Sequence, residues 1–400
     1  MKILHLIRSL NPAKGGTVEG LRLSSIAIQA EGHAVDILTL DQPGASWLKD
    51  FPTTVHALGT SLSTYGYSPH LLPWLRANAK NYDAIVINGI WQYQSFGAWR
   101  ALRRCGIPYF VFTHGMLDPW FRHTYPLKHI KKWLYWPWAD YRVLRDADAV
   151  LFTCEEERVL ARQSFWLYQC KEIVVGYGTA APIGDPDSQR ETFLQENPSL
   201  RGKRLFLFLG RIHKKKGCDI LIEAFSHIAS RDPSLHLVIA GPDQTGWQRE
   251  LVEQSNLLGI GGRISWLGMI SGDMKWGAYH AAEVFVLPSH QENFGIVVAE
   301  ALACGVPVLI SNKVNIWREI AADGAGIVVE DDLPGTITAL ESWLTLTDEK
   351  RNAMRQIAEQ TFLTRYEMTT SVKKLIELFG KFTHPNSRHQ SPLANQAPDS

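Results

Sequence analysis

Cysteine is scarce in this sequence of 400 residues, and its pattern excludes two kinds of stabilising chemistry. The five cysteines are odd in number, widely spaced, and form no CxxC pair or Cys/His cluster. Neither a disulfide framework nor a zinc site is therefore predicted. A reducing cytoplasm is the compartment that fits this usage best.

Long apolar runs and an excess of one charge are missing too. No stretch of about 18 apolar residues occurs, as a membrane-spanning helix would need, and Arg8 interrupts the first apolar run too early for a signal peptide. We therefore expect neither export nor a membrane span. With 41 basic and 40 acidic residues, nothing global favours nucleic acid, and any anion must be attracted by local charge.

Apolar residues, in contrast, are plentiful. Hydrophobic residues make up 45% of the sequence and aromatic residues 10%, which is enough to build a large core. Because single cores rarely exceed about 250 to 300 residues, this length predicts two domains.

Short β-branched or aromatic runs alternate with longer segments of helical period, which predicts an α/β fold with parallel sheets. The composition changes to Pro, Gly, Asp and Ser over residues 180–203, which we interpret as an interdomain linker. The predicted domains are residues 1–179 and 204–364, followed by a helix over 365–380 and a disordered tail over 381–400. The expected strands are 3–7, 35–40, 84–88, 109–113, 149–153, 172–176, 204–209, 236–240, 263–267, 284–287, 306–311 and 326–329, and the expected helices are 18–30, 94–105, 127–146, 217–230, 247–258 and 296–304.

Ligands of open parallel sheets bind beyond the carboxyl ends of the strands, so the loops at those ends are the candidate sites. After the first strand, Gly15 and Gly16 lead into a helix whose free amides and dipole suit a phosphate. A tight strand-to-helix turn explains the pair equally well, and the GxGxxG fingerprint is absent.

The second domain opens with a strand and then the concentrated positive charge of residues 211–216. A forked arginine and a lysine would together stabilise a diphosphate leaving group. The position of Arg211 and Lys216 at the end of the strand favours this role for them, and we interpret Lys214 and Lys215 as a solvated basic turn.

Residues 287–309 carry the strongest signal, because a buried strand runs into a polar loop and then a helix of small residues. Glu292 and Glu300 stand eight residues apart, which on a continuous helix leaves them roughly 80° out of line. They can share one ligand only if Glu292 precedes the helix, and Phe294-Gly295 is a natural junction for that. Carboxylates accept hydrogen bonds from sugar and ribose hydroxyls.

This pattern resembles glycosyltransferase family 4, the retaining nucleotide-sugar glycosyltransferases of the GT-B fold. The resemblance rests on two glutamates separated by seven residues, with Phe-Gly between them and Gly-x-Pro-Val after them. It continues in Gly210-Arg211, Lys216-Gly217, residues 240–243, residues 266–268 and Gly15-Gly16.

The resemblance implies residue roles. Arg211 and Lys216 would hold the donor diphosphate, Glu292 the donor sugar hydroxyls and Glu300 the nucleotide ribose. His114, which follows a strand of the first domain, would contact the donor sugar near its anomeric carbon, although a loop histidine bonded to backbone is the competing interpretation. Further donor contacts would come from the backbone of Gly15, Gly16, Phe294, Gly295 and Ile296 and from the loop after Gly268.

The resemblance also implies two doubly wound Rossmann-like domains that face each other across a cleft, the second binding the donor and the first the acceptor. It implies a hexosyltransferase that retains anomeric configuration and uses a glycan or lipid-linked glycan as acceptor. The helix over 365–380 would cross back to the first domain, and residues 113–120 look like a subgroup that builds surface polysaccharides.

Asp146 and Asp148 have the DxD form with which some transferases hold manganese. They precede a strand, at the end opposite the expected ligands, so we interpret them as a helix-to-strand connection, and Asp185 and Asp187 as a turn. We predict no metal and no cofactor besides the nucleotide-sugar donor.

Other functions remain open at this stage. A nucleotide-sugar 2-epimerase shares the fold, and a non-catalytic sugar-nucleotide-binding subunit would share the motifs. An NAD-dependent dehydrogenase would need the missing glycine fingerprint.

Residues 119–139 hold four cations, no acid and four tryptophans. At about 100° per residue, one helical face carries lysines and the other apolar side chains. Either the apolar side packs on the core with the lysines in water, or the patch rests on an anionic membrane surface, which would place the protein on the inner face of the cytoplasmic membrane. The lysine face contains Lys128, Lys131, Lys132 and Tyr135, and the apolar face contains Leu127, Ile130, Trp133 and Leu134.

Overall fold

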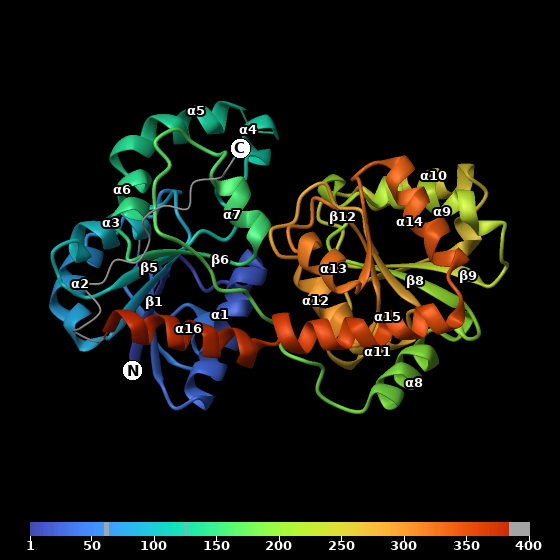
Figure 1. Cartoon of the computed structure of the whole chain (residues 1–400), viewed down its shortest axis with the longest axis horizontal. Helices are drawn as coiled ribbons and strands as arrows, with labels where there is room; N and C mark the ends of the chain where they lie inside the picture. The colour runs from blue at the N-terminus through green and yellow to red at the C-terminus, as the bar shows by residue number, and fades with distance from the viewer. Residues whose placement is uncertain (60–63, 125, 384–400) are drawn as a thin grey trace, which may run out of the picture. The chain divides into compact units, whose positions relative to one another are not determined.

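The computed structural model describes residues 1–59, 64–124 and 126–383, which divide into two compact units (Figure 1). The first unit comprises residues 1–152, 161–175 and those from 371 on, and the second comprises residues 153–160 and 176–370. Each unit contains one parallel sheet with helices on both faces, as the alternating sequence pattern predicts.

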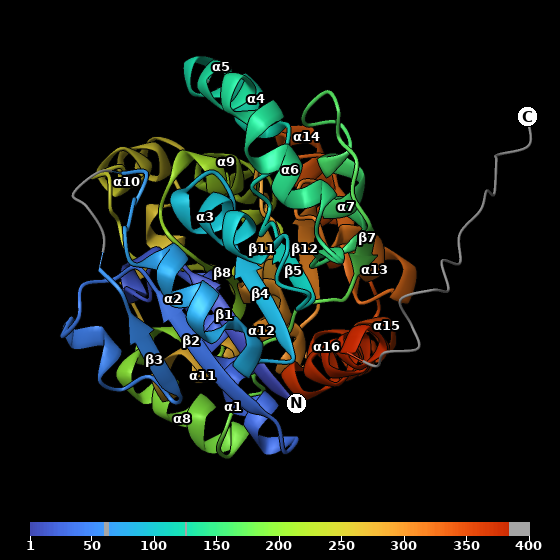
Figure 2. The same ribbon diagram turned by 90° about the vertical axis from the view of Figure 1, so that its left-hand side faces the viewer.

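The first unit is built on a sheet of seven parallel strands in the order β3-β2-β1-β4-β5-β6-β7. Successive side chains of β5 point to opposite faces, and both faces are covered: Phe110 packs on Phe379 of α16, and Val111 lies in the cluster that contains Leu71 of α2. Figure 2 shows the strands of this sheet side by side. The strands are β1 (Lys2–Ile7), β2 (Ala34–Thr39), β3 (Thr54–Ala57), β4 (Ala84–Asn88), β5 (Tyr109–Phe112), β6 (Ala149–Phe152) and β7 (Glu172–Val174); the helices are α1 (Gly16–Ala30), α2 (Leu71–Asn78), α3 (Tyr93–Leu102), α4 (Trp120–Thr124), α5 (Pro126–Tyr135), α6 (Asp140–Arg145) and nearly all of α16 (Met368–Thr383).

The second unit is built on six parallel strands in the order β10-β9-β8-β11-β12-β13. Its core is one continuous apolar cluster, in which the strands are buried on both faces as is usual for parallel sheets. The strands are β8 (Arg204–Leu209), β9 (Leu235–Ala240), β10 (Ile264–Gly268), β11 (Val284–Leu287), β12 (Val308–Ser311) and β13 (Gly326–Val329); the helices are α7 (Glu155–Ala161), α8 (Pro186–Glu196), α9 (Cys218–Ala229), α10 (Gln248–Leu257), α11 (Gly272–Ala281), α12 (Ile296–Ala303), α13 (Trp317–Asp323), α14 (Leu333–Thr345) and α15 (Asp348–Thr361).

The predicted linker over residues 180–203 is wrong for much of its length, because it contains helix α8. Pro186 stands in the first turn, where a missing N–H costs nothing, and the Asp185 side chain caps the Ser188 amide at 2.7 Å. Phe193 is fully buried in the core of the second unit. The segment is therefore part of the second unit.

Two other predictions need correction, and one strand was missed. The helix expected over residues 127–146 is broken between α5 and α6 by the 3-10 turn Trp136–Trp138, whose Pro137 lacks an amide donor. The predicted tail over 381–400 begins too early, since Lys381 lies within α16; residues 384–400 lie outside the described residues. The short edge strand β3 was not predicted.

The structure contradicts the interpretation in which the apolar side of helix α5 packs on the core. Leu127, Ile130, Trp133 and Leu134 are exposed, whereas Lys132 and Tyr135 turn toward the unit. Lys132 therefore belongs to the inner side of the helix, and the apolar side does not pack on the core. Within the described ranges, no helix combines the length and apolarity that crossing a bilayer requires.

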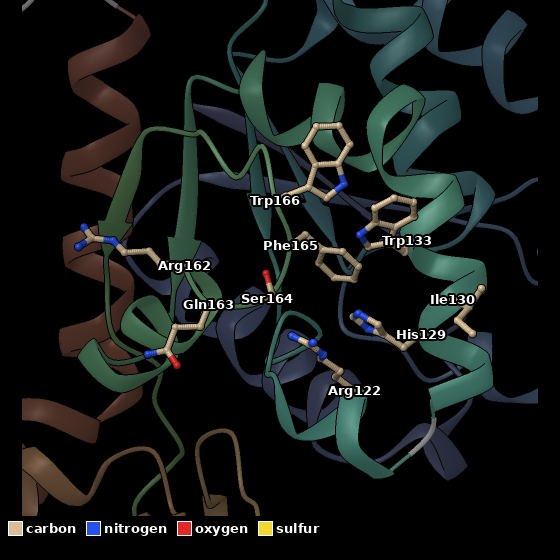
Figure 3. A pocket seen from close by; sticks show the side chains of 9 residues that line it. All are labelled: Arg122, His129, Ile130, Trp133, Arg162, Gln163, Ser164, Phe165 and Trp166. Atoms are coloured by element: carbon tan, nitrogen blue, oxygen red, sulfur yellow. The ribbon is translucent and has the colours of Figure 1, made fainter.

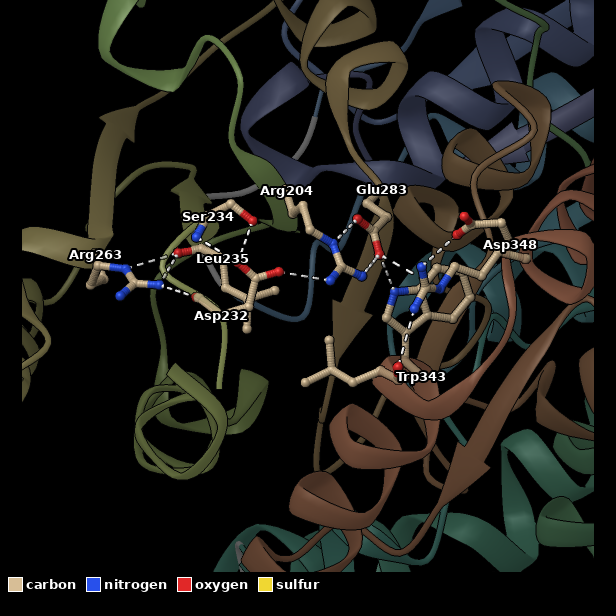
Figure 4. A network of polar contacts seen from close by, with 10 residues as sticks. Arg204, Asp232, Ser234, Leu235, Arg263, Glu283, Trp343 and Asp348 are labelled. Atoms are coloured by element: carbon tan, nitrogen blue, oxygen red, sulfur yellow. Dashed lines mark hydrogen bonds and ion pairs between the residues drawn. The ribbon is translucent and has the colours of Figure 1, made fainter. Parts of the chain in front are cut away.

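A polar network closes the amino ends of β8 and β11 (Figure 4). Arg204 donates from Nε and Nη2 to the Glu283 carboxylate at 2.7 Å each and from Nη1 to Asp232 at 3.0 Å. The Trp343 indole donates to Glu283 at 2.8 Å, and these bonds lower the pKa of that carboxyl against the effect of its burial. The network fixes this end of the sheet and leaves the carboxyl end for ligands.

Candidate active site

The carboxyl ends of β8 and β11 form the topological switch point of the second sheet. From β8 the chain proceeds to β9 and β10 on one side, and it returns to place β11, β12 and β13 on the other side. Strands β8 and β11 are parallel neighbours, so the loops that follow them meet. Ligands of doubly wound sheets bind in the crevice that such a reversal creates.

The loop after β8 is pressed directly against the loop after β11. A side chain at Gly217 would place its Cβ 2.3 Å from the carbonyl oxygen of Pro288, and this glycine has φ 68°, which favours a residue without Cβ. The amide of His290 donates to the carbonyl of Lys215 at 2.8 Å. These contacts hold Lys216 beside the polar loop that contains Glu292.

Lys216 and Glu292 form an ion pair at this junction. Lys216 is buried, and burial lowers the pKa of its ammonium to about 7, assisted by the neighbouring cations Lys215 and Arg211. The contacting Glu292 carboxylate acts in the opposite direction and favours the charged amine. The pair thus places one cation and one carboxylate, both largely shielded from water, where a ligand would enter.

The backbone of Glu292 is fixed by the loop after β12. Its amide donates to the carbonyl of Lys313 at 2.9 Å, and its own carbonyl accepts from the amide of Asn315 at 3.0 Å. Helix α12 begins at Ile296 after Gly295, so Glu292 precedes the helix as the sequence predicted. Phe294 is buried between the rings of Tyr177 and Tyr366, with centroids 5.3 and 5.6 Å away, and anchors this junction.

Glu300 lies within α12, and its carboxylate is already engaged by helix α11. Its Oε1 accepts from the ammonium of Lys275 at 2.8 Å and its Oε2 from the hydroxyl of Tyr279 at 3.2 Å. Lys275 and Tyr279 were not predicted, because no helix was expected over the residues of α11. Their spacing of four residues, which places two side chains on one helical face, is the signal that could have found them. Glu300 can serve a ribose hydroxyl only as a carboxylate shared with Lys275.

The other predicted residues of the second unit lie at the same ends of its strands. Arg211 follows β8 and is exposed, with Nη1 3.5 Å from Oε1 of Gln244. Gly268 ends β10, and its carbonyl accepts from the amide of Gly241 at 2.6 Å. The structure pairs Lys216 with Glu292 directly, whereas Glu300 pairs with Lys275 instead.

In the first unit, Gly15 and Gly16 stand at the start of helix α1. Gly15 has φ 81°, and no heavy atom lies within 4 Å of the Cβ that another residue would place there. Both glycines are exposed, and the helix begins at Gly16. This is the space and backbone geometry that close approach of a phosphate needs.

His114 follows β5 in the left-handed conformation, with φ 49°, which is uncommon for a residue that is not glycine. Its Nε2 lies 3.1 Å from Oδ1 of Asn88, the last residue of β4. Its ring stacks on Phe112, and burial lowers the pKa of His114 to about 4. The imidazole is therefore neutral near pH 7 and held by a side chain, not by backbone alone.

Asp146 and Asp148 lie near the amino ends of β5 and β6, away from His114. Asp146 accepts from the Trp99 indole at 2.8 Å, and Asp148 accepts from the amide of Tyr109 at 3.0 Å. Over the described part of the chain, no three His, Cys, Asp or Glu side chains gather as metal ligands.

The sequence of each part of the chain matches a known protein family. Residues 15–178 match the glycosyl transferase 4-like domain, and residues 189–361 match the glycosyl transferases group 1. The chain is similar to the glycosyltransferase of Rickettsia africae, with TM-score 0.76 and 15% identity over 96% of this chain and 99% of that one. It is also similar to Anabaena HepE in complex with UDP-glucose, with TM-score 0.71 and 18% identity over 95% of this chain and 99% of that one.

A curated relative is the D-inositol 3-phosphate glycosyltransferase of Salinispora tropica, 32% identical over 197 residues. That alignment covers 48% of this chain and 40% of the relative, so the chain spans less than half of its length. Both sheets and both domain matches define a protein of the GT-B class with two Rossmann-like domains. Within that class, the chain belongs to glycosyltransferase family 4.

Proposed function

We propose that this protein transfers a hexose from a nucleotide-diphosphate sugar to a hydroxyl of a glycan or lipid-linked glycan, with retention of anomeric configuration. The observation that carries the proposal is the Lys216–Glu292 ion pair at the switch point of the second sheet, directly before the start of helix α12. A cation, a carboxylate and free helix amides in one place suit a molecule that joins a diphosphate to a sugar.

In this proposal the second unit binds the donor. Lys216 and Arg211 stabilise the negative charge that grows on the leaving diphosphate, and Glu292 accepts hydrogen bonds from the sugar hydroxyls. Glu300 accepts a hydrogen bond from the ribose while the Lys275 ammonium donates to the same carboxylate. The amides at Gly295 and Ile296 bind further donor oxygens, and the loop after Gly268 flanks the base.

The first unit supplies the remaining groups. The open backbone at Gly15 and Gly16 admits the donor phosphates, and the neutral ring of His114 contacts the sugar near its anomeric carbon. The bond from the anomeric carbon to the phosphate oxygen breaks as the acceptor oxygen attacks from the same face. The departing phosphate takes the acceptor proton, which needs no further base.

Relatives and neighbours guide the choice of ligands to test. UDP-glucose in the HepE complex makes a UDP-sugar the first donor to examine, ahead of GDP- and ADP-sugars. The curated relative is named a D-inositol 3-phosphate glycosyltransferase, so a phosphorylated polyol is the competing acceptor to test.

Thermal unfolding with each nucleotide sugar tests the donor assignment. A donor at about 100 times its dissociation constant adds roughly 2.7 kcal/mol to stability, which is a clear rise in Tm. We expect the rise in wild type and in Lys214→Ala, whose lysine lies in the same turn, but not in Lys216→Ala. No rise with any nucleotide sugar would contradict the proposal.

Incubation of the stabilising donor without an acceptor distinguishes the rival functions. A 2-epimerase would convert the sugar in that mixture, and a non-catalytic subunit would bind the donor yet leave it unchanged with every acceptor. The proposed transferase yields product only with an acceptor, and NMR of the new linkage reports retention.

A further inference from the structure

Helix α5 presents an apolar face to solvent in the first unit. Leu127 is 77% exposed and Leu134 62% exposed, and Ile130 and Trp133 lie between them on the same side. Exposed leucines and a tryptophan on one helical face are unusual for a surface in water alone, and such faces mark interaction sites.

The outward position of this face is fixed by the inner side of the same helix. The ammonium of Lys132 lies 4.7 Å from the centroid of the Trp91 ring and 5.2 Å from that of Phe121. The Tyr135 hydroxyl lies 2.7 Å from that of Tyr65, and His129 stacks on Phe165. The helix cannot rotate its apolar face inward without breaking these contacts.

A second segment extends the apolar surface. Trp166 and Leu167 are exposed, and the ring of Trp166 lies 5.9 Å from that of Trp133. Leu167 has φ 61°, a conformation that is costly for a bulky residue and that the fold nevertheless maintains. Residues from α5 and from the loop after α7 therefore form one surface, which we name the α5 face: Leu127, Ile130, Trp133, Leu134, Trp166 and Leu167.

A pocket of about 510 Å³ adjoins the α5 face, and Ile130, Trp133 and Trp166 line it (Figure 3). Figure 3 shows the two indole rings beside the ring of Phe165, with Arg122 and His129 below them. The pocket thus joins aromatic rings to an exposed cationic side chain.

Positive charge borders the α5 face. Lys128 and Lys131 are exposed along one edge of the apolar stripe, and Arg122 lies in the preceding helix. No acidic residue occurs between positions 119 and 139 or between 159 and 171. An apolar stripe edged by lysines, with tryptophans beside it, is the pattern of a helix that lies in the plane of a bilayer surface.

We propose that the α5 face docks on an anionic lipid bilayer, with its leucines and indole rings in the interfacial region and Lys128 and Lys131 against the headgroups. This partner follows from charge complementarity combined with the apolar stripe. Only the purpose of docking rests on the proposed function: a docked first unit would lie close to a lipid-linked acceptor.

Vesicle sedimentation tests the contact without any turnover. Full-length protein is mixed with vesicles of phosphatidylcholine alone or of phosphatidylcholine with phosphatidylglycerol, at low and high salt. We expect binding to the anionic vesicles at low salt, and weaker binding at high salt and to the neutral vesicles.

Two double variants separate the apolar contribution to vesicle binding from the electrostatic one. Leu127→Gln/Leu134→Gln should weaken binding about tenfold or more, because it removes apolar area that enters the interface. Lys128→Glu/Lys131→Glu should weaken binding at least about 30-fold, since each basic residue near the surface contributes about fivefold. The matched controls are Leu257→Gln, a leucine 90% exposed in the second unit, and Lys350→Glu/Lys374→Glu, and both should bind as wild type does.

Absence of binding at low salt, or equal binding by wild type and the leucine variant with unchanged Tm, overturns the proposal. Self-association in gel filtration that the leucine variant abolishes, without vesicle binding, also overturns it and assigns the α5 face to a second copy. Vesicle binding by a chain that transfers no sugar would contradict the proposed function alone, and transfer to a soluble acceptor without vesicle binding would contradict the docking alone.

Discussion

The Nε2 atom of His114 lies 3.1 Å from the Oδ1 atom of Asn88, so the end of β4 orients a ring that follows β5. Since a carbonyl oxygen only accepts, Nε2 carries the proton of the neutral ring. The Asn88 amide nitrogen lies 3.3 Å from Nδ1 of the buried His5 in β1. Burial lowers the pKa of His5 to about 3, so the amide links two neutral imidazoles.

Replacing this amide with a carboxylate should create an acid limb in the pH profile. In wild type, His114 stays neutral above its pKa of about 4, so its state does not change between pH 5 and 8. Asn88→Asp places a negative charge beside the ring and raises its pKa, so activity should fall as pH decreases through the new value. The measurement is kcat/KM against pH with the identified donor and acceptor.

Two controls accompany that experiment. Asn88→Leu removes the acceptor without adding charge, so it should lower the rate at every pH without an acid limb. Asn78→Asp makes the same chemical change in helix α2 and should leave the profile unchanged. An Asn88→Asp profile parallel to wild type would show that the amide does not act through His114.

Lys216→Ala and Glu292→Ala should each remove most of the transfer activity and preserve the fold. Loss of one preorganised charge-stabilising group costs on the order of 10²- to 10³-fold in turnover. Lys214→Ala, in the same turn, should retain wild-type turnover. Turnover near wild type in both alanine variants, with the correct substrates, would refute the site.

The placement of several candidate site residues could be predicted because they follow strands that are easy to recognise. Short buried strands place Lys216 and Glu292 at the same edge of a parallel sheet, and Phe294-Gly295 marks where the helix starts. The sequence cannot indicate which cation meets which carboxylate, since that depends on packing between segments distant in the chain. For this reason the pair of Lys275 with Glu300 was not predicted.

The errors in the fold have similar physical causes. The period of α5 groups its apolar residues on one face, but it cannot show which side points inward, and the half-buried position of Lys132 depends on the rings of Trp91 and Phe121. Helix α8 was interpreted as a linker because prolines suggest irregular structure, although Pro186 occupies a first-turn position. Strand β3 is a short edge strand with few apolar residues.

The pair of Lys275 and Glu300 supports a double-variant cycle that separates stability from binding. Glu300→Gln leaves the largely buried ammonium of Lys275 without its carboxylate, so Tm should fall. Lys275→Met should also lower Tm, because it leaves the buried Glu300 carboxylate without its cation. The double variant should recover much of the Tm. If Glu300 binds the ribose, the donor KM should stay raised in the double variant, and full recovery of KM would assign the pair to stability only.

Transfer activity should survive EDTA. Asp146 and Asp148 accept hydrogen bonds from Trp99 and Tyr109, at the strand ends away from His114. The rate is measured before and after chelation and again after manganese is added. Complete loss that manganese restores would show that a metal takes part and that the DxD segment was misinterpreted.

The last prediction concerns helix α8, whose packing replaces the expected linker. A Cβ at Gly277 of α11 would lie 2.2 Å from the carbonyl oxygen of Gln189 and 2.7 Å from Cβ of Phe193. Gly277→Ala must therefore push the two helices apart, and overpacking of this kind typically costs about 1 to 3 kcal/mol.

The matched control is Gly262→Ala, because no heavy atom lies within 4 Å of the Cβ that it would add. We expect a lower Tm for Gly277→Ala and a wild-type Tm for Gly262→Ala in thermal unfolding. If α8 were only a tether between the two units, both variants would unfold at the wild-type temperature, since an unpacked segment has room for a methyl group.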